Sequence, residues 1–140
     1  MRVLVPVDGS DPADDAFAYA LELFDDAEFV ALYVMDPVDG EAAWGPGSGD
    51  EWLSAAEARS NSVLEAAAET AAAADREVAT DSTVGRPARA IVEYAEENDV
   101  DHIVIGSHGR DGISRVVLGS VAEMVVRRAP VPVTVARSNE

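Results

Sequence analysis

Five short strand-like runs recur along the chain, and a segment with helical periodicity separates each run from the next. The runs cover residues 3–7, 29–34, 78–84, 103–105 and 131–136. Apolar runs of this length are typical of buried strands. Strands that alternate with amphipathic helices form a parallel sheet with helices on both faces. The sequence therefore predicts an α/β fold with five parallel strands and four helices.

The helical segments repeat apolar residues at spacings of three and four, which indicates one buried face in each helix. Before the first segment, Ser10 or Asp11 is a candidate N-cap, and Pro12 suits the first helical position. A loop at 36–50 precedes the second helix, and the fourth helix lies around residues 121–128. The predicted buried positions are Ala13, Ala16, Phe17, Ala20, Leu21 and Phe24 in the first helix; Leu53, Ala56, Val63, Leu64 and Ala67 in the second; and Ala88, Ile91, Val92 and Ala95 in the third.

The strand order follows from which strands are apolar throughout. Strands one, two and four are almost wholly apolar, as central parallel strands should be. The third strand is mixed, with Thr80 and Ser82 on one face and Asp81 on the other, and the fifth carries Pro132, which suits an edge. These features predict the order 3-2-1-4-5. The topological switch then lies between strands one and four, and ligands bind at the carboxyl ends of such strands.

Composition excludes several functions. The chain has 140 residues, expected to form one domain over 1–140, and a net charge of -17 from 27 acidic and 10 basic residues, with no lysine. Such a charge repels nucleic acid, so we expect no nucleic-acid partner. The chain has no cysteine, no apolar run of the roughly 18–20 residues that span a bilayer and no signal-peptide pattern, which predicts a cytoplasmic protein without a membrane partner. The dispersed acidic residues favour a halophilic cytoplasm.

Residues 106–120, "GSHGRDGISRVVLGS", hold four of the ten glycines between the fourth strand and the fourth helix. Their spacing is Gly-x2-Gly-x9-Gly-Ser, and it ends where a helix N-terminus offers free N–H groups to an anion. The alternative is a capping box, in which Ser120 and Glu123 satisfy their own helix. The segment is not a P-loop, because no lysine follows the last glycine.

These features together resemble the universal stress protein family, in its ATP-binding subgroup. The resemblance rests on "VLVPVDGS" at residues 3–10, on residues 85–136, and on the Gly-x2-Gly-x9-Gly-Ser spacing, which is the family's nucleotide signature. It implies a Rossmann-like fold, bound ATP with Mg²⁺ or Mn²⁺ bridging the phosphates, and a homodimer formed through the C-terminal strand. It also implies these nucleotide contacts: Pro6 and Val7; Asp8, which accepts from the ribose; the Val34 backbone at the adenine; Gly106 near the ribose; and Gly109, Gly119, Ser120 and Val121 at the phosphates.

Alternatives remain open for several side chains. Asp8 could form only an Asx turn with Ser10, and Arg110 is a candidate phosphate contact that could equally be solvated or paired with Asp111. His108 is expected in an exposed loop and His102 in a structural position. Trp44 and Trp52, on either side of the Gly/Pro loop, are expected to pack rather than to cover a ligand.

The sequence as a whole predicts an ATP-binding regulatory module of the stress response. It lacks the cations and the positioned base that rapid phosphoryl transfer needs, so no catalytic residue is assigned. The alternatives are a nucleotide-independent dimeric scaffold for partner proteins and a slow ATPase. A dimer is also favoured by the predicted edge strand at 131–136, with Val131, Val133 and Val135 on one face.

Overall fold

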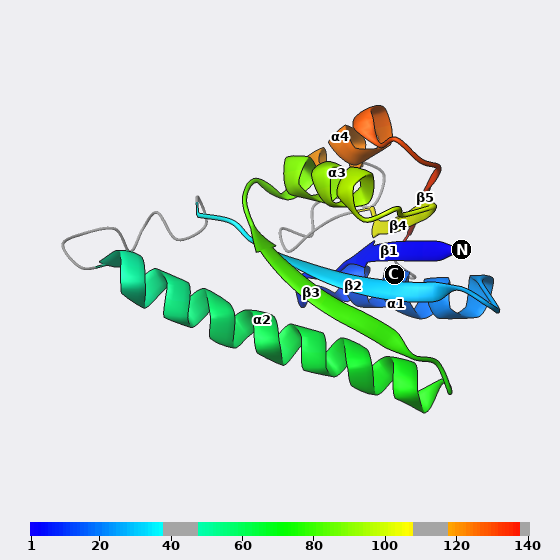
Figure 1. Ribbon diagram of the computed structural model, residues 1–140, viewed down its shortest axis with the longest axis horizontal. Helices are drawn as coiled ribbons and strands as arrows, with labels where there is room; N and C mark the ends of the chain where they lie inside the picture. Colours follow the sequence, from blue (N-terminus) through cyan, green and yellow to red (C-terminus); the bar gives the residue numbers. More distant parts are fainter. Residues whose placement is uncertain (38–47, 108–117, 138–140) are drawn as a thin grey trace.

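The structure, a computed structural model, describes residues 1–37, 48–107 and 118–137 (Figure 1). The elements alternate along the whole chain. They are β1 (Arg2–Pro6), α1 (Asp11–Leu23), β2 (Glu28–Met35), α2 (Ser48–Ala73), β3 (Val78–Val84), α3 (Pro87–Glu97), β4 (His102–Gly106), α4 (Ser120–Arg128) and β5 (Val133–Ala136). The five strands form one sheet in the order β3-β2-β1-β4-β5, and all neighbours are parallel. The predicted fold and strand order are confirmed.

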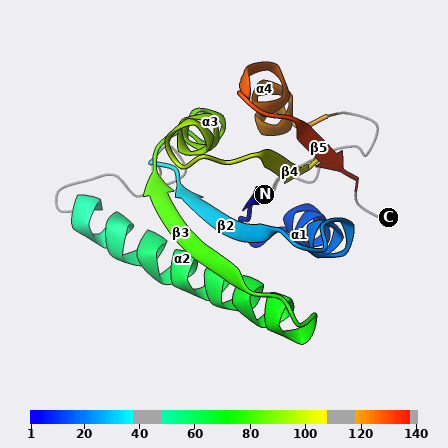
Figure 2. The same cartoon turned by 45° about the vertical axis from the view of Figure 1, so that its right-hand side comes forward.

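Two hydrophobic clusters, one on each face of the sheet, form the core. The α1/α2 core joins buried residues of those helices to Val3 and Val5 of β1. The α3/α4 core joins those other helices to Leu4, the β1 residue between them. Figures 1 and 2 show the two pairs of helices on opposite sides of the sheet. Period-two alternation along β1 therefore sends successive side chains into different cores.

Strand boundaries differ slightly from those predicted. β1 ends at Pro6 rather than at residue 7, although Val7 N still donates a hydrogen bond to Leu32 O over 2.9 Å. β5 begins at Val133 rather than at residue 131. Pro132 has no N–H for the ladder, which explains the later start, while its carbonyl oxygen still accepts from Ile103 N.

The second helix shows the largest difference. α2 begins at Ser48, inside the predicted loop at 36–50, and its buried stripe is Ser60, Leu64, Ala67 and Ala71. Leu53, predicted to be buried, is 39% exposed. The N-terminal end of α2 extends beyond the carboxyl ends of the strands (Figure 1), so the sheet cannot cover that turn. Trp52 does pack against the α1/α2 core, as expected, while Trp44 lies outside the described residues.

Among the helices of the described ranges, none combines the length and apolarity needed to cross a membrane.

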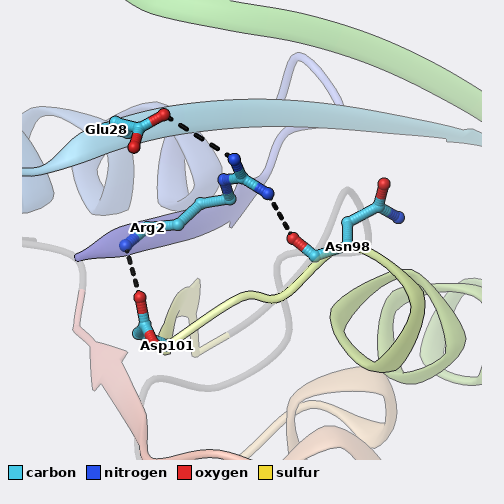
Figure 3. A network of polar contacts seen from close by, with 4 residues as sticks. All are labelled: Arg2, Glu28, Asn98 and Asp101. Carbon is cyan, nitrogen blue, oxygen red and sulfur yellow. Dashed lines mark hydrogen bonds and ion pairs between the residues drawn. The ribbon is translucent and has the colours of Figure 1, made fainter.

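A polar network fastens the amino ends of β1 and β4 together (Figure 3). Arg2 N donates to Asp101 Oδ2 over 2.8 Å, and Asp101 N donates back to Arg2 O. The Arg2 guanidinium donates through Nη1 to the Asn98 carbonyl at the end of α3 and lies 3.7 Å from Glu28 Oε2. A cation on a helix C-terminal carbonyl is also favoured by the helix dipole. The network is therefore structural, at the end of the sheet opposite the glycine segment.

We predict that Arg2→Met lowers the free energy of unfolding by about 1 kcal/mol, because a partly buried, charge-assisted hydrogen bond to Asn98 O is lost. Arg89→Met is the matched control, since Arg89 forms only an exposed pair with Glu93 and should change stability by roughly 0.5 kcal/mol or less. Urea unfolding of both variants measures the difference. Equal stability losses for the two variants would show that the network does not stabilise the fold.

Candidate functional site

The candidate site lies where β1 and β4 end side by side. β1 pairs with β2 as far as Pro6, but its register with β4 covers only Val3 and Leu4. α1 follows β1 onto one face of the sheet, whereas α4 follows β4 onto the other. The chain therefore leaves these two neighbouring strands in opposite directions, which is the geometry that opens a ligand crevice in a doubly wound sheet.

The loop after β1 holds Asp8 through Ser10. Asp8 Oδ1 accepts two hydrogen bonds, from Ser10 N over 2.9 Å and from Ser10 Oγ over 2.5 Å. Ser10 is buried and is the N-cap of α1, where its Oγ also accepts from Ala13 N over 3.3 Å. The Asx turn considered from the sequence is therefore present. It uses one carboxylate oxygen, and no described residue donates to Asp8 Oδ2.

Gly106, the last residue of β4, has a packing reason for being glycine. A Cβ atom there would lie 2.8 Å from Pro12 O and 2.9 Å from Pro12 C, in the first turn of α1. These are backbone atoms, so they cannot turn aside as a flexible side chain would. The missing side chain lets the start of α1 rest directly on the end of β4. This contact links the Asp8 loop to the β4 loop.

Two backbone hydrogen bonds hold the ends of the β4–α4 segment. Ser107 N donates to Ala136 O of β5 over 3.0 Å, and Gly119 N donates to Ser107 O over 2.7 Å. Gly119, Ser120 and Val121 are thus brought back beside the end of β4. The signature residues Gly109 and Arg110, together with His108, lie outside the described residues.

The N-terminus of α4 has no side-chain cap. Gly119 is the N-cap, Ser120 is the first helical residue, and no side chain forms a capping hydrogen bond. The capping box between Ser120 and Glu123, which was the alternative from the sequence, is therefore absent. The Glu123 carboxylate instead pairs with Arg127 over 3.0 Å on the next turn. The first N–H groups of α4 are left without a side-chain acceptor in the described part of the chain, which favours an anion there.

Pro6, Val7 and Val34 complete the set predicted from the sequence. Pro6 ends β1, and Val7 is buried in the α1/α2 core. Val34 lies in β2, two residues beyond Leu32, where the pairing with β1 stops. Its side chain packs against the α3/α4 core. The structure therefore gathers Pro6 to Asp8 with Gly106 and the start of α4, and puts Val34 on the adjacent strand.

Negative charge gathers at the start of α1. Although Asp14 is exposed as a residue, its carboxyl is partly shielded from water, and this desolvation, followed by repulsion from Asp11, Asp8 and Asp15, raises its pKa. A raised carboxyl pKa means that the folded state disfavours the ionised form. Ionised Asp14 therefore lowers stability above its folded pKa, and the loss disappears as the pH falls and the carboxyl binds a proton.

His102 lies away from this site. It begins β4, its Nε2 is 2.7 Å from Thr134 Oγ1, and its ring lies 5.1 Å from that of Phe24 between centroids. Burial lowers its pKa. The expectation of a structural histidine agrees with these contacts. Sequence reasoning named Ser10 both as an N-cap candidate and as the partner of Asp8 in an Asx turn, and the structure shows that it takes both roles at once.

The strand order and the helices on both faces define an α/β protein of the doubly wound class, with its switch point between β1 and β4. Residues 1–137 match the Universal stress protein family, and the chain belongs to that family. It is 35% identical over 143 residues to universal stress protein MJ0531 of Methanocaldococcus jannaschii, covering 97% of this chain and 81% of that protein.

Solved structures of the family resemble the fold closely. UspA from Lactobacillus plantarum has a TM-score of 0.84 and 30% identity, with 98% of this chain and 97% of that chain covered. A universal stress protein in complex with cAMP has a TM-score of 0.75 and 28% identity, with 99% and 98% covered. The ligand of that second structure is an adenine nucleotide.

We predict that Gly106→Ala lowers the free energy of unfolding by about 1–3 kcal/mol, because α1 must move away from β4 to admit the methyl group. Gly106→Val should cost more. Thermal and urea unfolding without added ligand measure both variants. If Gly106→Ala is as stable as the wild type, the close contact with Pro12 is not what requires glycine.

Proposed function

We propose that the protein is an ATP-binding universal stress protein that acts as a regulatory module of the stress response. Two observations carry the proposal: the Asp8 carboxylate follows β1, and the uncapped N-terminus of α4 is held beside the end of the neighbouring strand β4. A carboxylate accepts hydrogen bonds from hydroxyl groups, while helix N–H groups bind phosphate oxygens. A ribose phosphate carries both kinds of group, and a family relative of similar fold binds cAMP.

The proposed nucleotide contacts follow the same division of chemistry. Asp8 accepts from the ribose, the Val34 backbone meets the adenine, and the glycines let the phosphates come close. The full set is Pro6, Val7, Asp8, Val34, Gly106, Gly109, Arg110, Gly119, Ser120 and Val121. A divalent cation, Mg²⁺ or Mn²⁺, bridges the phosphates in this proposal. The described residues hold no cluster of three or more His, Cys, Asp or Glu suited to a metal ion, so the phosphates supply its main ligands.

Regulation is favoured over rapid catalysis by the chemistry of the site. Phosphoryl transfer needs cations around the developing charge and a group that orients the nucleophile. The chain has no lysine, and acidic residues occupy the first turn of α1. A cytoplasmic location in a salt-rich cell, without nucleic-acid or membrane partners, remains part of the proposal.

We predict that Gly119→Val and Gly109→Val abolish ATP binding without unfolding the protein, because each side chain enters the space proposed for phosphate. Gly119 has an ordinary φ of -63°, so valine does not strain the backbone there. Ala79→Val on the exposed edge strand β3 is the control and should bind ATP normally. Calorimetry in concentrated KCl with Mg²⁺ measures binding, and circular dichroism checks the fold.

The two alternative functions give different results in the same experiment. A nucleotide-independent scaffold shows no ATP binding by the wild type. An ATPase of ordinary speed releases phosphate at about 1 per second or faster. Equal ATP binding by the wild type and both glycine variants would mean that the nucleotide, if bound, occupies another place.

We further propose that two copies pair through β5. In the described structure β5 contacts β4 on one side only. The carbonyl oxygens of Pro132 and Ala136 accept from the β4 side, so by alternation the backbone groups of Val133 and Val135 point to the free edge. Beside this edge lies a groove of about 290 Å³ lined by Asp15, Tyr19, Val135, Ala136 and Arg137. A second β5 related by a two-fold axis satisfies both edges.

We predict that the double variant Val133→Pro, Val135→Pro is monomeric, because it removes two outward N–H donors and leaves the ladder with β4 intact. Thr134→Pro is the control: by the same alternation its N–H points toward β4, so this variant should lose stability. Light scattering in concentrated KCl measures the mass of each. A monomeric wild type would rule out the dimer.

A further inference from the structure

The Asp8 carboxylate accepts two hydrogen bonds from a single neighbour, Ser10. Both hydrogen bonds that reach its carboxylate from the described residues come from Ser10, and both end on Oδ1. The hydroxyl bond, at 2.5 Å between oxygens, is shorter than the 2.9 Å bond from the amide. Among the described residues, Oδ1 therefore has two donors, both on Ser10, and Oδ2 has none.

The hydroxyl of Ser10 does more than cap α1. A serine hydroxyl has one proton to donate, and here that proton goes to Asp8 rather than to a backbone carbonyl. The cap itself uses a lone pair that accepts from Ala13 N at 3.3 Å, a longer bond than the one that the hydroxyl donates to Asp8. Ser10 is 8% exposed, so water competes little for these groups. A residue that served only as an N-cap would leave its proton to solvent.

The turn that carries Ser10 is itself fixed. Its N-terminal side continues from β1, and its C-terminal side enters α1, whose first turn rests on Gly106 of β4. The Asp8 carboxylate therefore cannot swing toward or away from β4 without breaking the contacts of Ser10 or moving α1. Oδ2, to which no described residue donates, therefore keeps its position relative to the end of β4.

We infer that Ser10 is a positioning residue for ligand binding, which holds Asp8 so that Oδ2 accepts from the vicinal hydroxyl groups of a ribose. The inference rests on the proposed nucleotide function and deepens it. A carboxylate whose first oxygen is occupied selects a ligand group that donates, and the 2′- and 3′-hydroxyls donate whereas phosphate does not. Ser10 touches no ligand itself and acts through Asp8.

The test compares ATP with 2′,3′-dideoxy-ATP, which lacks both hydroxyls, by calorimetry in concentrated KCl with Mg²⁺. The wild type should prefer ATP. Ser10→Ala should weaken ATP binding by about tenfold, the scale of one hydrogen bond to a charged group. The same variant should change the binding of the dideoxy nucleotide by about twofold or less, because that ligand gains nothing from an ordered Asp8.

Two further variants separate positioning from capping. Ser10→Thr keeps the hydroxyl and should restore the preference for ATP. Ser10→Gly removes the hydroxyl but is well tolerated at an N-cap, so it should be more stable than Ser10→Ala and yet lose the preference equally. Melting temperatures of all variants report the capping effect.

Outcomes for this inference differ from outcomes for the proposed function. If Ser10→Ala weakens both nucleotides equally, or neither, while the wild type binds ATP, then Ser10 does not position Asp8 and the nucleotide function stands. If the wild type binds neither nucleotide, the proposed function fails and the inference falls with it. Loss of the ATP preference in Ser10→Ala and Ser10→Gly, with recovery in Ser10→Thr, supports both.

Discussion

Burial of β1 on both faces is the constraint on which the rest of the structure depends. Val3, Leu4 and Val5 are wholly inaccessible to solvent, and their alternation divides the interior into the α1/α2 core and the α3/α4 core. A strand covered in this way needs helices on both sides and a strand along each edge. The chain satisfies that need by winding in opposite directions from β1 and from β4. The crevice at their carboxyl ends is a consequence of this winding.

Close backbone packing then turns the crevice into a defined site. Gly106 lets the first turn of α1 lie against β4, and Gly119 N bonded to Ser107 O returns the chain to the same place. Both the acidic loop after β1 and the start of α4 are thereby fixed relative to the end of β4. Preorganisation of this kind lowers the conformational cost of binding.

The two helix N-termini that follow β1 and β4 have opposite electrostatic characters. α1 is capped by Ser10 and carries Asp11 and Asp14 in its first turn, so its dipole is already compensated. α4 begins at an uncapped glycine, and the carboxylate of its first turn, Glu123, is engaged by Arg127. An anion at this end of the sheet is therefore attracted to α4 and repelled from α1. That division agrees with a ligand whose hydroxyls meet Asp8 and whose phosphates meet Gly119.

The sequence by itself determined the strand order and the family, because apolar runs and glycine spacing are local patterns. Tertiary structure alone decided that Gly106 of β4 packs against the first turn of α1. This contact joins segments that are distant along the chain, so no local pattern predicts it. Leu53 shows the same limit: its spacing was right for burial, but it is 39% exposed in the folded chain. Periodicity predicts which face of a helix is apolar, and only the assembled fold decides whether another element packs against that face.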